Sequence, residues 1–460
     1  MSAIHDQAMH YIYKQVLERV LGNMSQAQRA SLQLLVQRLL VAAGGVEYMG
    51  ALRLLVVQGN DRGSARLLTL LRAAQLTIAL RAPETFRLRV LVVCLPALGN
   101  HKLESHERLF NTLFMHDDVR VQLQMIEGGE VVPFSRRPTP KAERWTLARN
   151  ALLLFGHMID ARPEALLGSR MHLELADALR QALAGQKGGD VVLTAMPARQ
   201  RRRYLSWARR TLRQAGEQGL RGMPQCLAEV LDGLGALHAV AGTALDPARD
   251  PELPASEPAM LRVIAVDDLC VSQPGSDPLD ELLGCRFESN LDGKPLGAFL
   301  DPLAITHLHE MRAQCIDPDT PRLSLRLANA SSLLRPYEAV QARFAKTYGI
   351  SQAQLTCALF SPFAHRGRDL ERYLQCRQPD MLVALPYLHR ALQGKPCPEP
   401  VKDWLVNTSG LTLAQMRAIY EGRIPPSARQ ILTSLARRDV QLRLLRRQPH
   451  STPAPCKASP

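Results

Sequence analysis

Six arginines that share one side of an expected helix are the residues best placed to do chemistry. The segment Pro197–Gln214 reads PARQRRRYLSWARRTLRQ, and at about 100° per residue the six fall within a stripe about 120° wide. They are Arg199, Arg202, Arg203, Arg209, Arg210 and Arg213. Arg201 points away from the stripe, and residues such as Leu205 and Trp207 occupy the remaining side. Because arginine makes bidentate contacts with phosphate oxygens, the stripe predicts docking on a row of phosphates.

Other interpretations of this stripe remain open. The arginines can form a solvated helix face that pairs with carboxylates from other elements. A calmodulin-like partner or a membrane surface also attracts a basic amphipathic helix. Only Asp190 and Glu217 lie near the stripe in the sequence, so pairing within the helix cannot neutralise it.

The composition is that of a globular protein with an unusual charge. Apolar residues make up 46% and charged residues 22% of 460 residues, which excludes a wholly disordered chain and a collagen-like fibre. There are 57 Lys and Arg against 43 Asp and Glu, a net charge of +14, which suits nucleic acid, an acidic membrane or an acidic protein. We expect no transmembrane segment, no secretory signal and reduced cysteines, and therefore a cytoplasmic protein. A secreted effector without a signal peptide would share these features.

A second feature lies at Val401–Arg438, where the pattern predicts three short helices. They span Val401–Thr408, Thr412–Tyr420 and Ala428–Arg438, with Gly410 supplying a positive-φ turn and Gly422 ending the second helix. The expected core of this segment is Leu405, Val406, Leu411, Met416, Ile419, Ile431, Leu432 and Leu435.

This segment resembles the helix-turn-helix of the Cro/CI-like phage repressor family. The resemblance rests on the order Glu421, Gly422, Pro425, Ser427, Leu432, Leu435 and Ala436. It implies that the Thr412–Tyr420 helix lies in the major groove of DNA with base contacts from its first turn. The matching base-reading positions, Leu413, Ala414 and Ala418, cannot form hydrogen bonds with bases, whereas Thr412, Gln415 and Arg417 can touch a phosphate or a base. A helical scaffold kept for packing is the alternative.

A similar spacing occurs at Phe344–Ala358, where Ala345, Gly349 and Leu355 occupy helix-turn-helix positions. Its recognition turn would present Ser351, Gln352 and Gln354 to bases. An ordinary helical hairpin with Ser351 as its N-cap explains the pattern too, and we favour it.

Three other patterns do not support a site. The loop Gly59–Ser64 lacks the lysine of a phosphate-binding loop, so an ordinary strand-to-helix turn is expected. Asp267 and Asp268 follow an apolar strand and are expected to form a turn rather than a magnesium site. The histidines form no closed ligand set. We therefore assign no catalytic, cofactor-binding or metal-binding residue, and we lean against an enzyme.

The elements that must position these residues indicate an α/β plus α fold. Residues 1–245 should form a helical hairpin, in which Ser25 starts the second helix, and a mixed α/β domain that carries the basic helix. The expected strands are Leu52–Gln58, Leu76–Leu80, Arg87–Leu95, Val119–Met125 and Asp190–Leu193, with two long helices between residues 138 and 187. A proline-rich linker at 246–258, a small α+β region at 259–330, a helical module at 331–447 and a disordered tail at 448–460 follow.

These features lead us to expect a cytoplasmic protein that docks on nucleic acid in a regulatory or mobile-element setting. We expect DNA rather than RNA as the partner. A protein-interaction or secretion-associated factor whose arginines meet an acidic protein is one alternative. An enzyme of unrecognised type that uses the N-terminal sheet is another.

Overall fold

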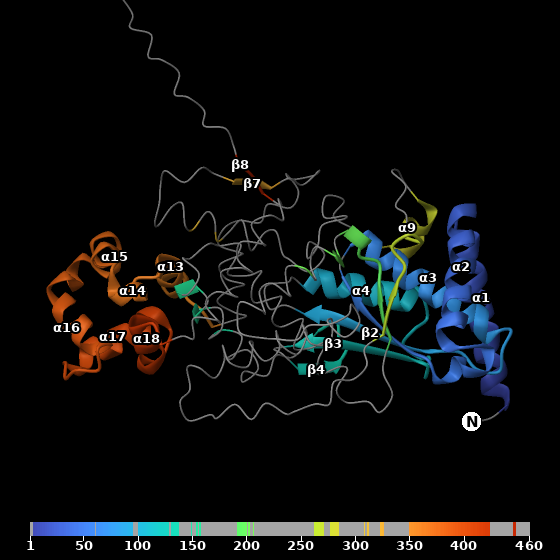
Figure 1. Cartoon of the computed structure of the whole chain (residues 1–460), viewed down its shortest axis with the longest axis horizontal. Helices are drawn as coiled ribbons and strands as arrows, with labels where there is room; N and C mark the ends of the chain where they lie inside the picture. Colours follow the sequence, from blue (N-terminus) through green and yellow to red (C-terminus); the bar gives the residue numbers. More distant parts are fainter. Residues whose placement is uncertain are drawn as a thin grey trace, which may run out of the picture.

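The structure is a computed structural model (Figure 1). It describes residues 3–59, 61–94, 100–127, 130–137, 191–199, 262–270, 277–284 and 349–423, together with 149, 153, 154, 156, 157, 201, 202, 206, 308, 311, 323–325 and 445–447. The linker 246–258, the tail 448–460 and the expected helix Ala428–Arg438 lie outside these residues, as do most residues of the two helices expected between 138 and 187.

A mixed sheet organises the N-terminal half. In the described part of the chain it has six strands, in the order β4-β3-β2-β1-β5-β6. The strands are β1 (Arg53–Gln58), β2 (Arg87–Cys94), β3 (Val121–Glu127), β4 (Glu130–Pro133), β5 (Val191–Thr194) and β6 (Arg262–Ala265). All neighbouring pairs are parallel except β3 with β4. Because β1 lies between β2 and β5, with Val56 opposite Val90 on one side and Leu193 on the other, the chain leaves β1 and β5 toward opposite edges of the sheet.

Helices accompany this sheet in the N-terminal unit. They are α1 (Ala3–Gly22), α2 (Gln26–Ala43), the 3₁₀ helix η1 (Val46–Ala51), α3 (Arg62–Ala79), α4 (Asn100–Thr112) and α9 (Pro278–Leu283). The predicted capping box of α2 is confirmed, because the Ser25 hydroxyl accepts from Gln28 N and the Gln28 side chain accepts from Ser25 N. Gly44 ends α2 with a φ of 91°.

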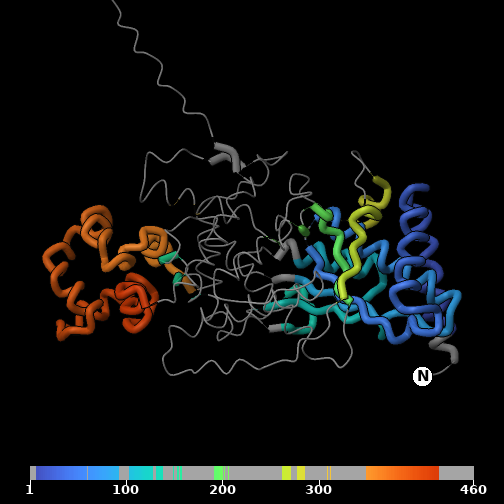
Figure 2. Tube along the Cα trace, viewed as in Figure 1, coloured from blue at the N-terminus to red at the C-terminus, as the bar shows by residue number. Residues whose placement is uncertain are grey.

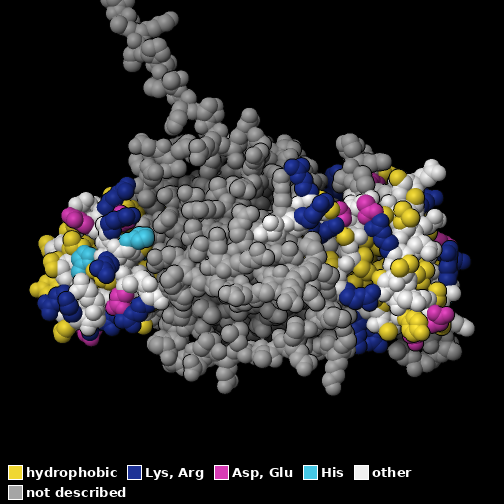
Figure 3. Space-filling view, in the orientation of Figure 1, with side chains coloured by type: hydrophobic (Ala, Val, Ile, Leu, Met, Phe, Trp, Pro, Cys, Tyr) yellow, Lys and Arg dark blue, Asp and Glu magenta, His cyan; other side chains and the backbone are white. Residues whose placement is uncertain are grey.

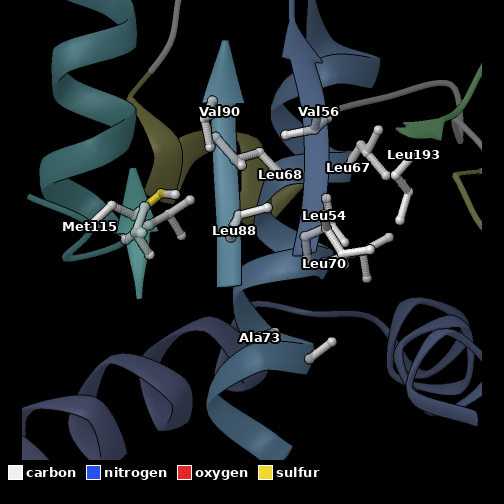
Figure 4. Close-up of a cluster of buried hydrophobic side chains, with 14 of the residues drawn as sticks. Leu54, Val56, Leu67, Leu68, Leu70, Ala73, Leu88, Val90, Met115 and Leu193 are labelled. Carbon is white, nitrogen blue, oxygen red and sulfur yellow. The ribbon is translucent and has the colours of Figure 1, made fainter. Parts of the chain in front are cut away.

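The central helix α3 lies inside the N-terminal unit. It contacts β1 and is covered by α1, α2 and α9. Figure 4 shows Leu68 of α3 between β1 and β2, near Leu88 and Val90. Leu68, Leu88 and Val90 are fully buried, so the core lies between α3 and the sheet.

The C-terminal module contains only helical elements between residues 349 and 423. These are α13 (Gln352–Phe360), α14 (Ala364–Gly367), α15 (Leu370–Arg377), the 3₁₀ helix η3 (Pro379–Ala384), α16 (Leu385–Leu392), α17 (Glu399–Ser409) and α18 (Leu413–Glu421). The expected turn at Gly410, with a φ of 71°, and the expected stop at Gly422, with a φ of 70°, are confirmed. Val406, expected in the core, is 39% exposed, because it lies on the outer side of α17.

The predicted fold class is confirmed, since helices accompany a mixed six-stranded sheet in the described residues. One strand was predicted wrongly: Leu76–Leu80 belongs almost entirely to α3, because Asp61 caps a helix that continues for 18 residues to Ala79. Strand β4 has no counterpart in the sequence analysis. The helical stretch expected up to Arg447 is interrupted by β8 (Leu445–Arg447), which pairs with β7 (Leu323–Leu325).

The domain boundaries also need correction. The expected α+β region at 259–330 begins with β6, which pairs with β5 in the N-terminal sheet, and α9 contacts α3. Figure 2 shows this yellow segment beside the blue N-terminal helices. Gly156, expected within the first domain, contacts the helical module, where its carbonyl oxygen accepts a hydrogen bond of 2.7 Å from Ser361 Oγ. The physical reason is that sheet pairing and helix packing join segments that lie far apart in the sequence.

Candidate nucleic-acid interface

The basic helix begins directly after β5 and is held at its start by Asp267. The Asp267 carboxylate, which follows β6, accepts a hydrogen bond of 3.0 Å from Ala198 N and one of 2.6 Å from Arg201 Nη1. Arg201 also donates to Met196 O. Partial burial opposes ionisation of Asp267, but the Arg201 and Ala198 hydrogen bonds outweigh it and hold the pKa of this carboxyl below its usual value. A carboxylate on the first turn of a helix also complements the helix dipole.

The first two arginines of the stripe lie on another side of this helix. Arg199 and Arg202 are both exposed, and neither guanidinium forms an ion pair with a carboxylate in the part of the chain that the structure describes. Arg201, which the helical projection sets apart from the stripe, is the arginine that turns toward the protein. Arg203, Arg209, Arg210 and Arg213 lie outside the described residues. The start of the helix therefore presents positive charge to solvent.

Asp268 is engaged as firmly as its neighbour. Its Oδ1 accepts a hydrogen bond of 2.7 Å from Arg38 Nη1, and its Oδ2 accepts from Arg38 Nη2, so one guanidinium of α2 binds both oxygens. The two acidic residues after β6 thus serve as anchors for arginines. No cluster of three potential metal ligands occurs among the described residues.

The first turn of α18 uses its polar side chains internally. The Thr412 hydroxyl accepts from Gln415 N, and Gln415 Oε1 accepts a hydrogen bond of 2.9 Å from Thr412 N, so the two residues form a capping box. Gln415 is 9% exposed. Arg417 Nε donates to Ala391 O over 2.9 Å, which ties α18 to α16. The three side chains expected to reach DNA from this helix therefore already make hydrogen bonds within the module.

The other helix-turn-helix segment shows the same use of polar groups. Ser351 caps α13, as the helical-hairpin alternative expects, with Gln354 completing a second capping box. Gln354 Nε2 also donates to Asn407 O over 3.2 Å. Gln352 is exposed at the start of α13. Since α13 packs against α17, the two segments form one helical unit, with Gln354 at its internal contact.

The turn between α17 and α18 is also covered. A Cβ atom at Gly410 would lie 2.9 Å from Leu153 Cδ1 and 3.0 Å from Arg149 Nη2. Side chains of two upstream residues therefore lie against the turn. This close approach requires glycine at position 410, in addition to its left-handed backbone conformation.

The loop after β1 is likewise satisfied from within. Asp61 Oδ1 accepts from Ser64 N over 3.0 Å, so a carboxylate occupies the start of α3 where a phosphate would otherwise bind. On the same helix, Arg66 donates to both Asp277 and Asp280 of the α9 region over 2.9 Å. This geometry agrees with an ordinary strand-to-helix turn.

Asp267 anchors the basic helix, a role that sequence reasoning missed. Its partner Ala198 lies 69 positions earlier, and only the pairing of β5 with β6 brings the two together. An acidic residue directly after a parallel strand was the available signal, because neighbouring parallel strands end at the same edge of a sheet.

Comparisons with known proteins do not extend these observations. No family model matches the chain, and no curated protein or solved structure matches it significantly. Among the described helices, none is long and apolar enough to cross a membrane.

Proposed function

We propose that this chain docks on nucleic acid, in the first instance duplex DNA, through phosphate contacts made by the basic helix. The proposal rests on a difference between the first arginines of the helix. Arg201 binds Asp267, whereas Arg199 and Arg202 are exposed. A helix fixed at its start can present a constant face to a regular row of phosphates. Such contacts position a protein on DNA without reading its sequence.

Contact with the phosphate backbone of DNA is favoured over direct reading of its bases. Base reading requires side chains with free donors and acceptors at the edge of the protein. In this chain Gln415 and Gln354 complete capping boxes, and Arg417 donates to a main-chain carbonyl. We therefore propose that the chain binds DNA with little preference for sequence and that the Cro/CI-like segment contributes packing. A regulatory or mobile-element role would then depend on how much of the DNA the protein occupies rather than on an operator sequence.

The test is a salt titration of DNA binding with the full-length chain. Fluorescence anisotropy with a labelled duplex of arbitrary sequence gives the affinity at several salt concentrations. The wild-type affinity should fall steeply with salt, and R199Q/R202Q should reduce the slope of log affinity against log salt by about 2, since each lost phosphate contact removes about 0.9 from it. Replacing all six stripe arginines should remove most of the binding.

The matched control is R136Q/R137Q, which removes the same charge at two exposed arginines away from the basic helix. Equal losses in the two double variants would show that only net charge matters and would overturn the proposal. Poly-glutamate serves as a second probe. If poly-glutamate competes as strongly as DNA at the same concentration of negative charge, the stripe recognises carboxylates, and an acidic protein replaces nucleic acid as the partner.

A further inference from the structure

A stripe of exposed side chains runs along the outside of η3 and α16 in the helical module. Val383 is 86% exposed and Tyr387 is 44% exposed, and Pro386 and Arg390 are exposed as well. Val383 belongs to η3, and Pro386, Tyr387 and Arg390 follow it in α16, where Arg390 shares one side of the helix with Pro386 and Tyr387; we call these four positions the α16 stripe. The opposite side of α16 packs into the module through Leu388, Ala391 and Leu392, which are fully buried.

The apolar side chains of this stripe are exposed. In η3 none of the residues is fully buried: Met381 and Leu382 are half-buried, and Val383 is exposed. Isolated exposed apolar residues are common, but a group of neighbouring ones, such as Val383, Pro386 and Tyr387, is typical of an interaction site. Tyrosine is also enriched at the centres of protein interfaces, because its ring supplies apolar area and its hydroxyl tolerates water.

The charges around the stripe distinguish its two ends. Arg390 lies at one end, with the exposed Lys395 beyond it, and the segment 381–398 contains no acidic residue. Asp380 is exposed at the other end, at the start of η3. Figure 3 shows hydrophobic and basic side chains next to each other over α16, at the left edge of the view. A partner that covers the stripe must therefore offer negative charge next to Arg390.

We propose that the α16 stripe binds an amphipathic helix of another protein, with the acidic end of that helix against Arg390. Apolar residues of the partner at i, i+3 and i+4 would cover Val383 and Tyr387. The charge asymmetry between Asp380 and Arg390 would fix the direction in which the helix lies. Nucleic acid does not suit this surface, because its centre is apolar. The site is separate from the basic helix and does not depend on the DNA proposal.

The experiment uses the full-length chain and defined synthetic peptides. The probe is a labelled amphipathic helical peptide with leucines on one face and glutamates near one end, and the control peptide carries lysines in place of the glutamates. Fluorescence anisotropy should show binding of the glutamate peptide and more than about tenfold weaker binding to Y387D, as expected for a central interface residue. R390E should weaken binding of the glutamate peptide and strengthen binding of the lysine peptide.

The matched control is V406D, which places the same charge at another exposed valine, on α17 and off the stripe. It should leave peptide binding unchanged, and circular dichroism should show that all variants fold. Equal affinity for both peptides, or no binding by either, would overturn the proposal. Light scattering measures the oligomeric state and tests whether a second copy of this chain covers the stripe instead. If the wild type is a dimer that Y387D converts to a monomer, a second copy covers the stripe and the proposal is wrong.

Discussion

His389 of α16 and Tyr420 of α18 meet directly, with Nδ1 of the histidine 2.9 Å from the tyrosine hydroxyl. Both rings lie against Gly367, the last residue of α14. Gly367 has a φ of 74°, and His365 and Arg366 just before it are also left-handed, at 52° and 61°. A tight left-handed turn is thus held against a hydrogen-bonded pair of side chains, and this arrangement joins three helices of the module.

Replacing Gly367 with alanine should destabilise the module strongly. A Cβ atom there would lie 2.9 Å from His389 Cε1 and 3.0 Å from Tyr420 Cε2. The backbone penalty of about 1–2 kcal/mol would add to an overpacking cost of about 1–3 kcal/mol. The control is Gly394→Ala, which has a similar φ of 77° but nothing closer than 3.9 Å to its new Cβ atom. Thermal unfolding should show a clearly larger loss for G367A, and equal losses would refute the steric argument.

Stability should fall as the pH drops below about 6.5, in part because of His157. This ring is fully buried beside Phe363, and burial lowers its pKa to about 3. The unfolded chain binds the proton more readily, so the stabilisation is complete above pH 6.5 and decreases toward pH 3, by about 1.4 kcal/mol per pH unit for one such group. Burial also lowers the pKa of His389, which acts in the same direction.

The measurement is urea unfolding of wild type and His157→Leu between pH 7 and pH 4. Leucine removes the titrating group from an apolar site, so the stability of the variant should depend less on pH. His10→Leu, at an exposed histidine of α1, is the control. If H157L and wild type lose stability in parallel, His157 does not contribute to the pH dependence.

Asp118→Asn should cost about 3–5 kcal/mol of folding stability. The Asp118 carboxylate accepts from Arg72 Nη1 over 2.7 Å, and both side chains are completely buried. Burial alone would raise the pKa of Asp118, but hydrogen bonds and charge from Arg120 and Arg72 lower it. Asparagine would leave the Arg72 charge buried without its counterion. Denaturant unfolding should separate D118N from Asp117→Asn, the exposed neighbour, and a similar small effect in both would contradict this role.

Asp267→Asn offers a prediction whose sign separates two explanations. Removal of a negative charge near the basic helix should strengthen DNA binding if only net charge matters. If Asp267 positions the helix through Ala198 and Arg201, binding should weaken despite the added positive charge. The control Asp268→Asn removes the same charge from the adjacent residue, whose partner is Arg38 of α2. Anisotropy at low salt should show weaker binding for D267N only, and tighter binding for both would rule out the positioning role.

The local features of this fold could be predicted from the sequence, whereas its distant contacts could not. Ser25 and Ser351 both begin helices, as their S-x-x-Q patterns indicate, since a capping box needs only four consecutive residues. The strands β1, β2, β3 and β5 also match their apolar runs. Leu76–Leu80 misled because a short apolar run fits a buried helix as well as a strand. The anchoring of Arg201 depends on the register of β5 with β6, which no local pattern contains.

The late return of the chain to the sheet has a consequence for anyone who divides this protein. A fragment that stops in the proline-rich segment near residue 250 would leave one side of β5 without its hydrogen-bonding neighbour and would free Arg38, Arg66 and Arg201 from the carboxylates that hold them. Such open edges recruit other chains and promote aggregation. During synthesis on the ribosome the same exposure lasts until residue 280 has emerged, so the first half of the chain must wait for the second before its sheet and its ion pairs are complete.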